Sequence, residues 1–382
     1  MKKNIKKKRV LIISPDSRHF VQNYINNVLA GGDFEILFLS MNADRDDPTW
    51  KENSVKVYNL KEDANEATFL TILKAPFKLL YFRKQIGKMD IIHYHYIDYR
   101  FTRLTDFFMR RRSARTIMTF WGSDLLKATG RQINAFRNIY KRSYAINVMS
   151  KEMLDTFTEM TGGKYNDKAI ILDFGNSTIE KIALELTSKC RIETKKAYNL
   201  PKDKVIVHVG YNGAIAQQHI KVAEVLEKLS KTLKEKIYVV IPFGYGCVND
   251  EYYREVNEAF LNTGIDFRID TKYLSQEEVI AYRPTADIFL YAQETDAISS
   301  SVLEYLCAGA YVIKPIWLDY SEYTKNGVKM RDFCEFKDIK DILEKVISNK
   351  EYGLLNVDNN RQFIISHKSW KVLKREWLKL YS

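Results

Sequence analysis

Short apolar runs alternate with amphipathic segments along the first half of the chain. One such segment, residues 19–30, has helical spacing and stops at the glycine pair 31–32, as a helix C-terminus often does. Apolar runs of strand length that are separated by helices indicate a parallel sheet covered on both faces. The expected strands of this half are 9–14, 34–40, 54–59, 90–96, 115–120, 144–150 and 168–174.

The same alternation starts again after Pro201. Ser275 and Glu278 have the spacing of a capping box at the start of one of the helices expected here. The expected strands are 204–210, 237–243, 266–270, 286–292 and 311–315, and the expected helices are 219–234, 251–264 and 275–283. A basic amphipathic segment, 361–381, predicts a last helix that returns to the first half of the chain.

The repeated pattern predicts an α/β protein with two doubly wound, Rossmann-like domains that face a cleft. We place the first domain at 1–176, with 358–382 packing back on it, and the second at 200–357. A length of 382 residues agrees with two domains. The four cysteines show no C-x-x-C spacing, which argues against a zinc site and against a disulfide framework. No apolar run approaches the roughly 20 residues of a membrane span, so we expect a cytoplasmic protein.

Positive charge is the main compositional bias of the chain. The formal net charge is +12, which admits nucleic acid, anionic lipid or a polyanionic substrate as partners. Residues 2–9 and 107–115 concentrate this charge. Residues 69–88 combine an apolar side with five lysines and arginines, so they can form either a helix on an anionic membrane or a core helix with a basic outer face. No known nucleic-acid-binding module is recognisable, and we expect no nucleic acid partner.

Candidate chemistry gathers in residues 293–313, directly after the expected strand 286–292. Ligands of doubly wound sheets bind at the carboxyl ends of the strands. A helix that starts at Ser300 or Ser301 offers free backbone N–H groups and the positive end of its dipole, which suit a diphosphate. Asp296 and Glu304 can reach sugar hydroxyls. The spacing of Ser301 and Glu304 equally fits a capping box that needs no ligand.

The spacing Asp296-x7-Glu304, followed by a helix, small-Gly-small at 308–310 and a strand, resembles the Glu-x7-Glu donor motif of family 4 glycosyltransferases with the GT-B fold. The resemblance extends over nearly the whole chain. The resemblance implies that Glu304 contacts the ribose of the donor and that the region of Asp296 contacts its sugar. The other similar segments are 9–14, 90–98, 119–126, 144–153 and 205–213.

The resemblance also implies roles for individual side chains. His95 would contact a sugar hydroxyl, and Asp124 would contact the acceptor or else cap the next helix. Arg283 is a candidate for balancing the phosphate charge, as is Lys272, although a surface capping role at a helix end fits Arg283 equally well. The remaining donor-binding candidates are Gly210, Asn212, Gln218, Ser299, Ser300 and Ser301.

The chain departs from the family pattern at three places. No glycine-rich loop follows the first strand, and Trp121 stands where the family usually has histidine. Many members place an arginine and a lysine in the early loops of the donor domain, where this chain has 211–221 with Gln217, Gln218 and His219. That loop, with 239–256, looks more like the transferase that adds 4-acetamido-4,6-dideoxygalactose to a lipid-linked glycan.

His93 and His95 lie on one face of an expected strand, but no further metal ligand has suitable spacing, so we expect no metal and no cofactor. The resemblance implies a retaining, metal-independent glycosyltransferase. Its donor would be a nucleotide-diphosphate sugar and its acceptor a glycan or lipid-linked glycan, in bacterial surface-polysaccharide or glycoconjugate synthesis at the inner face of the membrane. The alternatives are a nucleotide-sugar epimerase of related fold and a basic nucleic-acid-binding protein.

Overall fold

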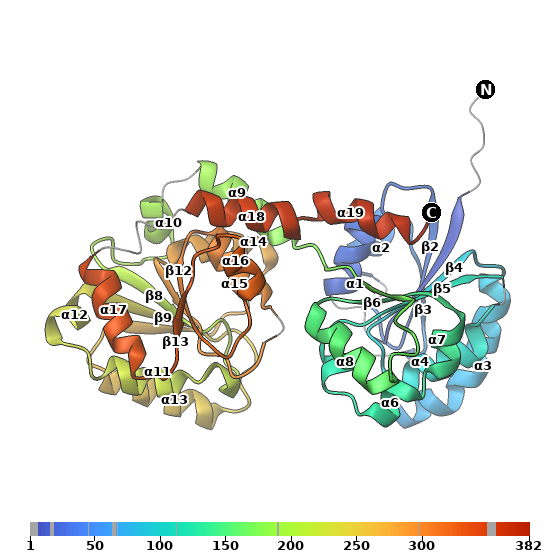
Figure 1. The fold of residues 1–382 in the computed structure, drawn as a ribbon, viewed down its shortest axis with the longest axis horizontal. Coiled ribbons are helices and arrows are strands. Elements are labelled where there is room, and N and C mark those ends of the chain that lie inside the picture. Colours follow the sequence, from blue (N-terminus) through green and yellow to red (C-terminus); the bar gives the residue numbers. More distant parts are fainter. Residues whose placement is uncertain are drawn as a thin grey trace. The chain divides into compact units, whose positions relative to one another are not determined.

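The computed structural model describes residues 7–15, 19–44, 46–62, 66, 68–111, 113–188, 191–296, 298–349 and 357–382. The chain divides into two compact units. Unit 1 comprises Met1–Gly175 and Trp370–Ser382, and unit 2 comprises Asn176–Ser369. Each unit is a parallel sheet with helices on both faces, as the alternating apolar runs predicted (Figure 1).

Unit 1 contains, within its described residues, a seven-stranded sheet in the order β3-β2-β1-β4-β5-β6-β7, with every pairing parallel. The strands are β1 (Lys8–Ile13), β2 (Phe34–Ser40), β3 (Lys56–Asn59), β4 (Ile91–His95), β5 (Arg115–Thr119), β6 (Ser143–Val148) and β7 (Ala169–Ile171). Leu11 and Ile13 face one hydrophobic cluster, whereas Val10 and Ile12 face the other. This period of two places a core on each face of the sheet.

The helices of unit 1 cover both cores. Helices α3, α4, α6 and α8 contribute to the cluster around Leu11, and α2 and α19 to the cluster around Val10. Their bounds are α1 (His19–Tyr24), continued by a π-turn η1 (Ile25–Leu29), α2 (Pro48–Glu52), α3 (Thr68–Ile86), α4 (Tyr99–Met109), α5 (Ser123–Leu126), α6 (Gly130–Asn134), α7 (Arg137–Arg142), α8 (Lys151–Thr161) and α19 (Trp370–Lys379).

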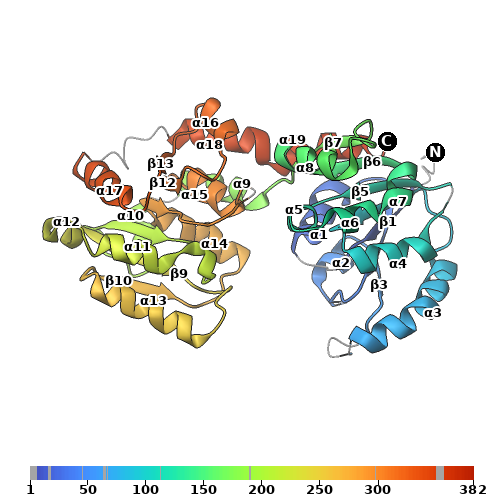
Figure 2. The same cartoon turned by 60° about the horizontal axis from the view of Figure 1, so that its bottom comes forward.

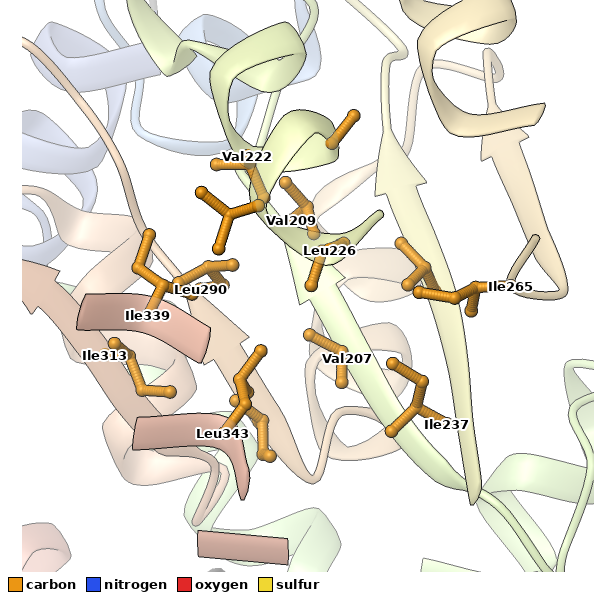
Figure 3. Packing of buried hydrophobic residues seen from close by; sticks show 14 of the residues in the cluster. Val207, Val209, Val222, Leu226, Ile237, Ile265, Leu290, Ile313, Ile339 and Leu343 are labelled. Atoms are coloured by element: carbon orange, nitrogen blue, oxygen red, sulfur yellow. The ribbon is translucent and has the colours of Figure 1, made fainter. Parts of the chain in front are cut away.

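Unit 2 contains, in the part of it that is described, a six-stranded sheet in the order β10-β9-β8-β11-β12-β13. The strands are β8 (Val205–Val209), β9 (Ile237–Pro242), β10 (Phe267–Asp270), β11 (Ile288–Leu290), β12 (Tyr311–Pro315) and β13 (Arg331–Phe333). Figure 3 shows one of its cores, where strand residues such as Val207 and Leu290 meet Leu226 of one helix and Leu343 of another. The short β13 was not predicted, because Arg331 and Asp332 give it no apolar alternation.

The helices of unit 2 follow the expected order with one difference. The single helix expected over 219–234 is two helices, separated at residues 227–230. The capping box of Ser275 and Glu278 is confirmed. The bounds are α9 (Ser177–Ser188), α10 (Arg191–Ala197), η2 (Ile215–Gln217), α11 (His219–Leu226), α12 (Lys231–Lys236), α13 (Asp250–Asn262), α14 (Gln276–Tyr282), η3 (Arg283–Thr285), α15 (Ser300–Cys307), α16 (Ser321–Lys325), α17 (Asp338–Ser348) and α18 (Val357–Lys368).

The C-terminal segment is divided between the units, which differs from the prediction that 358–382 packs on the first domain. Helix α18 belongs to unit 2, because Ile364 is buried in a cluster of that unit and Asn360 hydrogen-bonds Lys329. Only α19 returns to unit 1, where Trp377 Nε1 donates to the carbonyl of Asp173 and Tyr381 hydrogen-bonds Tyr24. Residues 177–199, which the prediction left between the domains, belong to unit 2 apart from 189–190, which lie outside the described residues, and unit 2 begins at Asn176.

The strand orders place a topological switch point in each sheet. In unit 1 the chain leaves β1 for β2 on one side and returns to β4 on the other, and in unit 2 β8 lies between β9 and β11. Loops that follow the strands at such points are the usual ligand sites of doubly wound sheets. Among the helices in the described ranges, none combines the length and the apolar composition that crossing a bilayer requires.

Candidate functional site

The start of α15 is the centre of the candidate site in unit 2. Helix α15 begins at Ser300, one of the two predicted starts, and follows the loop that leaves β11. Ser299 is its N-cap, and its Oγ accepts a hydrogen bond from the backbone N–H of Ser301 over 3.2 Å. The capping box expected from Ser301 and Glu304 is therefore wrong. Ser301 lies inside the first turn, and the Glu304 carboxylate bonds to other side chains.

Arg283 is the main partner of Glu304. Its Nε lies 3.0 Å from Glu304 Oε2, and its Nη2 donates to Ser301 Oγ over 3.1 Å. Its Nη1 donates to the hydroxyl of Tyr305, while the guanidinium also lies 4.5 Å from the centroid of that ring. Arg283 is only 6% exposed, so the surface capping role considered for it is wrong.

Arg283 keeps its charge although it is buried. Burial by itself would lower the pKa of Arg283, but Tyr305 and Glu304 outweigh burial and raise it. Asn176 Nδ2 lies 3.4 Å from the second carboxylate oxygen of Glu304, so both oxygens have partners. The contacts of Arg283 with Glu304, Tyr305 and Ser301 use three of its five guanidinium N–H donors, which leaves two for a ligand.

Asp296 organises the loop in front of α15. Its Oδ2 accepts hydrogen bonds from the Tyr291 hydroxyl at 2.9 Å, the Tyr320 hydroxyl at 2.5 Å and the Ser299 backbone N–H at 2.8 Å. Ile298 has a φ of +68°, a strained conformation for a β-branched residue that this network holds in place. A contact of Asp296 with a donor sugar remains a prediction.

The loop after β8 needs glycine at its first position. Gly210 has a φ of +66°, and a Cβ there would lie 3.0 Å from both Gln217 Oε1 and His219 Nε2. These two atoms are buried, and neither has a hydrogen-bond partner of good geometry among the described residues. Burial lowers the pKa of His219 to about 4, so its imidazole is neutral at pH 7. Buried polar atoms without partners are uncommon and mark a place where a ligand or water can complete the contacts.

The polar candidates of that loop hold it in shape. Gln218 has a φ of +56°, and its Nε2 donates to the carbonyl of Ala292 over 2.6 Å, while its Oε1 accepts from Lys221. Asn212 Oδ1 accepts from the backbone N–H of Ala214. The atoms without partners are thus Gln217 Oε1 and His219 Nε2. These two residues flank Gln218, which was the predicted donor-binding residue of this loop.

Two exposed tyrosines follow adjacent strands of the same sheet, and the sequence-based candidates missed them. Tyr245 comes after β9 and Tyr273 after β10, with 49% and 70% of their surfaces exposed and ring centroids 6.1 Å apart. Gly244 permits this approach, because a Cβ there would lie 2.3 Å from the carbonyl oxygen of Lys272. The Lys272 ammonium is itself paired with Glu278. A tyrosine three residues after the end of each of two strands was the available signal.

In unit 1, His95 is the last residue of β4 and is buried. Both of its ring nitrogens lack a hydrogen-bond partner within the described ranges. The ring lies among aromatic neighbours, with centroids 4.6 Å from Tyr24 and 5.8 Å from Trp121. Burial lowers the pKa of His95 to about 3, so the imidazole is neutral. A neutral imidazole can donate one hydrogen bond and accept another, which suits a hydroxyl.

His93 differs from His95 although both lie on one face of β4. Its Nδ1 lies 2.5 Å from the Tyr381 hydroxyl, and its Nε2 lies 2.7 Å from Thr119 Oγ1. Both nitrogens are therefore engaged in the core. In the part of the chain that the structure describes, no group of three or more His, Cys, Asp or Glu side chains is placed to hold a metal ion.

Further unsatisfied groups lie at neighbouring strand ends of unit 1. Ser14 Oγ, directly after β1, and Trp121 Nε1, shortly after β5, are buried and lack hydrogen-bond partners among the residues described. Because β1, β4 and β5 are adjacent, these groups and His95 belong to the same edge of the sheet. The loop without glycines after β1 lies partly outside the described residues, at 16–18.

Asp124 holds two loops of that edge together. Its Oδ1 accepts from the backbone N–H groups of Trp121 and Gly122 at 2.8 and 2.9 Å, and its Oδ2 accepts from Ile97 at 2.7 Å. Burial raises the pKa of Asp124, although these backbone hydrogen bonds oppose the shift. The contact with the backbone N–H of Gly122, the N-cap residue of α5, agrees with the helix-capping role considered for Asp124, and contact with the acceptor stays a prediction.

No protein-family model matches the chain. The chain is 27% identical over 250 residues to the uncharacterized glycosyltransferase MJ1069 of Methanocaldococcus jannaschii, a match that covers 64% of this chain and 59% of the relative. The match thus spans less than two thirds of the length of that curated protein.

Several solved structures resemble the chain over nearly its whole length. A glycosyltransferase from Rickettsia africae has a TM-score of 0.75 at 14% identity, with 98% of each chain covered. Anabaena Alr3699/HepE in complex with UDP and glucose has a TM-score of 0.69 at 10% identity, with 98% of this chain and 99% of that one covered. The UDP-GlcNAc 2-epimerase of Neisseria meningitidis has a TM-score of 0.62 at 12% identity over 98% of this chain and 99% of its own. With its two doubly wound parallel sheets, the chain therefore has the GT-B fold.

Proposed function

We propose that the chain is a glycosyltransferase that moves a sugar from a nucleotide-diphosphate donor to a glycan or lipid-linked acceptor. One observation carries the proposal: a serine-capped helix N-terminus beside a buried arginine–glutamate pair, at the carboxyl edge of the unit 2 sheet. The likeness to a curated glycosyltransferase and to a structure that contains UDP supports the same class.

In this proposal the start of α15 binds the diphosphate. Its free backbone N–H groups and dipole favour an anion, and the Ser300 hydroxyl adds a donor. Arg283 supplies a fixed positive charge with two remaining N–H donors close to the same turn. These groups would stabilise the negative charge that develops on the leaving diphosphate, which is an electrostatic role. We therefore propose that the reaction does not require a metal ion.

The nucleoside end of the donor would lie toward Tyr245 and Tyr273. Their exposed rings offer faces on which a base can stack. Tyr245 lies close enough to the arginine–glutamate pair to sense both charges. Partial burial raises the pKa of Tyr245, the charge of Arg283 lowers it, and the charge of Glu304 raises it. Glu304 is proposed to contact the ribose by exchanging its long hydrogen bond to Asn176, which measures 3.4 Å.

In unit 2, Asp296 is proposed to contact the donor sugar, and in unit 1 the strand ends are proposed to bind the acceptor. His95 is proposed to bind a sugar hydroxyl, because its two unsatisfied nitrogens provide a donor and an acceptor. The loops that Asp124 holds together would position Trp121 beside it. We propose retention of anomeric configuration and a role in bacterial surface-polysaccharide or glycoconjugate synthesis, at the inner face of the membrane, on the strength of the family resemblance.

An epimerase is the second candidate, because the epimerase of Neisseria meningitidis has a similar fold. The two functions differ in one measurable way. An epimerase converts the nucleotide sugar without an acceptor, whereas a transferase releases nucleoside diphosphate as it glycosylates the acceptor. Conversion of the nucleotide sugar to its epimer in the absence of any acceptor would replace the proposal.

A thermal-shift screen of nucleoside diphosphates and their sugars tests the donor site, with EDTA in parallel wells. We expect one nucleotide series to raise the melting temperature, with or without EDTA, and Glu304→Ala to weaken that shift. Unchanged binding by a destabilised Glu304→Ala variant would overturn the proposed role of this carboxylate. Salt-sensitive binding to arbitrary oligonucleotides with no nucleotide-sugar affinity would favour a nucleic-acid-binding protein instead.

A further inference from the structure

Helix α3 exposes large apolar side chains to solvent. Phe77 is 77% exposed and Phe69 is 70% exposed, although both are fully apolar. The other exposed apolar side chains of α3 are Leu70, Ile72, Leu73, Leu80 and Tyr81. Soluble proteins rarely expose so many large apolar side chains on one helix, and such a patch marks an interaction site.

The exposed face is not the face that packs on the sheet. Thr71, Ala75, Leu79 and Ile86 are buried, with the spacing of one helical stripe. Positions 69, 73, 77 and 80–81 recur with a similar spacing, about half a turn away around the helix. Helix α3 is therefore apolar on two sides. The interpretation of 69–88 as a core helix is confirmed, because Ala75, Leu79 and Ile86 lie in a buried cluster, but its outer face carries large apolar side chains as well as basic ones.

Basic residues accompany the exposed face. Residues 68–88 contain no aspartate or glutamate, and Lys84 and Lys88 are exposed at the C-terminal end of the helix. At the other end, Glu66 and Glu62 pair with Lys74 and Lys78. The lysines of this segment that have no acidic partner in α3, Lys84 and Lys88, thus lie at the C-terminal end of the helix.

The neighbouring helix extends this surface. Helix α4 packs against α3, and Figure 2 shows the two side by side in unit 1. Phe107 near the end of α4 is 63% exposed, and the guanidinium of Arg110 lies 5.7 Å from the centroid of its ring. Arg83 Nη1 donates to the carbonyl of Phe108, which fixes the ends of α3 and α4 together.

We propose that the outward face of α3 docks on an anionic lipid bilayer. Phe69, Leu73 and Phe77 enter the boundary between headgroups and acyl chains, and Lys84 and Lys88 contact lipid phosphates. A helix with this distribution of apolar and basic residues lies in the plane of the interface. The inference deepens the proposed function by naming the docking surface, and it rests on that function only for the lipid-linked acceptor.

The charge of the chain favours a bilayer over a second copy. Two copies meeting through α3 would bring a net charge of +12 each toward one another, without acidic residues in α3 to balance it. An anionic membrane provides both the apolar layer and the negative charge that this face lacks.

Flotation with vesicles of phosphatidylglycerol and phosphatidylcholine tests the proposal. We expect the full chain to float with anionic vesicles and at least tenfold less with pure phosphatidylcholine. The double variant Leu73→Ser/Phe77→Ser should lose at least tenfold in the vesicle-bound fraction, as should Lys84→Ala/Lys88→Ala. Leu261→Ser is the matched control, because Leu261 is 63% exposed on α13 of unit 2.

Insertion can be measured separately with tryptophan. Phe77→Trp should show a blue-shifted emission when anionic vesicles are added, and Leu261→Trp should not. Wild-type protein that does not float, or flotation that Leu73→Ser/Phe77→Ser leaves unchanged, would overturn the proposal. Dimers that this double variant dissociates, without vesicle binding, would assign the face to a second copy instead.

Neither readout requires turnover. Flotation without any nucleotide-dependent thermal shift would remove the glycosyltransferase proposal and leave the docking surface in place. A thermal shift without flotation would do the reverse. The serine variants should keep the circular dichroism spectrum and the nucleotide-dependent thermal shift of the wild type, because the substituted side chains lie in solvent on α3.

Discussion

The Nε atom of Arg283 lies 3.0 Å from Oε2 of Glu304, and both side chains are almost fully buried. The pair joins the end of α14 to the second turn of α15, next to the helix start where a donor diphosphate is proposed to bind. A buried ion pair contributes little net stability, because desolvation offsets the attraction. Its position at a helix N-terminus therefore calls for a test that separates structure from binding.

Arg283→Met removes the charge and keeps much of the volume. We expect it to destabilise the protein by about 3–5 kcal/mol, because Glu304 would be left buried without its main partner. The double variant Arg283→Met/Glu304→Leu should recover most of this loss in urea unfolding, yet remain unable to bind nucleoside diphosphate by calorimetry. Nucleotide binding by the double variant at wild-type affinity would show that the pair serves the fold alone.

The N-cap of α15 allows a matched comparison. Ser299 Oγ and Ser275 Oγ each accept from a backbone N–H over 3.2 Å, at the starts of α15 and α14. Ser299→Ala and Ser275→Ala should each reduce the free energy of unfolding by about 1 kcal/mol. Only Ser299→Ala should also weaken nucleoside diphosphate binding, because only α15 is proposed to hold the phosphates. Equal binding by the two variants would contradict that assignment.

His95 makes the stability of unit 1 depend on pH. Its pKa in the folded protein is about 3, against about 6.5 for an unperturbed histidine. Between these values the unfolded chain takes up a proton that the folded chain does not. Stability is therefore unaffected by this group above pH 6.5 and falls by about 1.4 kcal/mol per unit as pH drops toward 3.

Urea unfolding at pH 4.5, 5.5 and 7 checks this dependence for the His95→Leu variant. Tryptophan fluorescence follows mainly unit 1, which contains Trp50, Trp121, Trp370 and Trp377. Below pH 6.5, the free energy of unfolding of the variant should depend on pH less steeply than that of the wild type, by the equivalent of about one proton. His367→Asn, at an exposed position of α18, should keep the wild-type slope. An identical slope in His95→Leu would mean that the imidazole is accessible to protons in the folded state.

The sequence predicts local features well and long-range partners poorly. The start of α15 is readable because Ser299 precedes an apolar helical period. The partner of Glu304 is not, because Arg283 lies in another element and only packing brings them together. Likewise, the period of α3 reveals apolar residues such as Phe77 and Leu79, but only the structure shows that Leu79 is covered and Phe77 is exposed. The two parallel sheets could be predicted from the sequence, because short, continuous apolar runs are typical of strands buried on both faces.

The loop after β8 offers the last test, through two glycines with the same backbone conformation. Gly210 and Gly264 both have a φ of +66°, but a Cβ at Gly264 would meet nothing within 4 Å, whereas at Gly210 it would lie 3.0 Å from Gln217 and His219. Gly264→Ala should lose about 1–2 kcal/mol from backbone strain alone. Gly210→Ala should lose more, because the added methyl group displaces the unsatisfied Gln217 and His219.

That difference between the two alanine variants separates backbone strain from damage to the candidate donor site. Nucleoside diphosphate affinity, measured by calorimetry below the melting temperature of both variants, should fall at least tenfold in Gly210→Ala and remain unchanged in Gly264→Ala. Equal affinities would exclude the buried polar atoms near Gly210 from donor binding. The proposed site would then be confined to the α15 N-terminus and the side chains around Arg283.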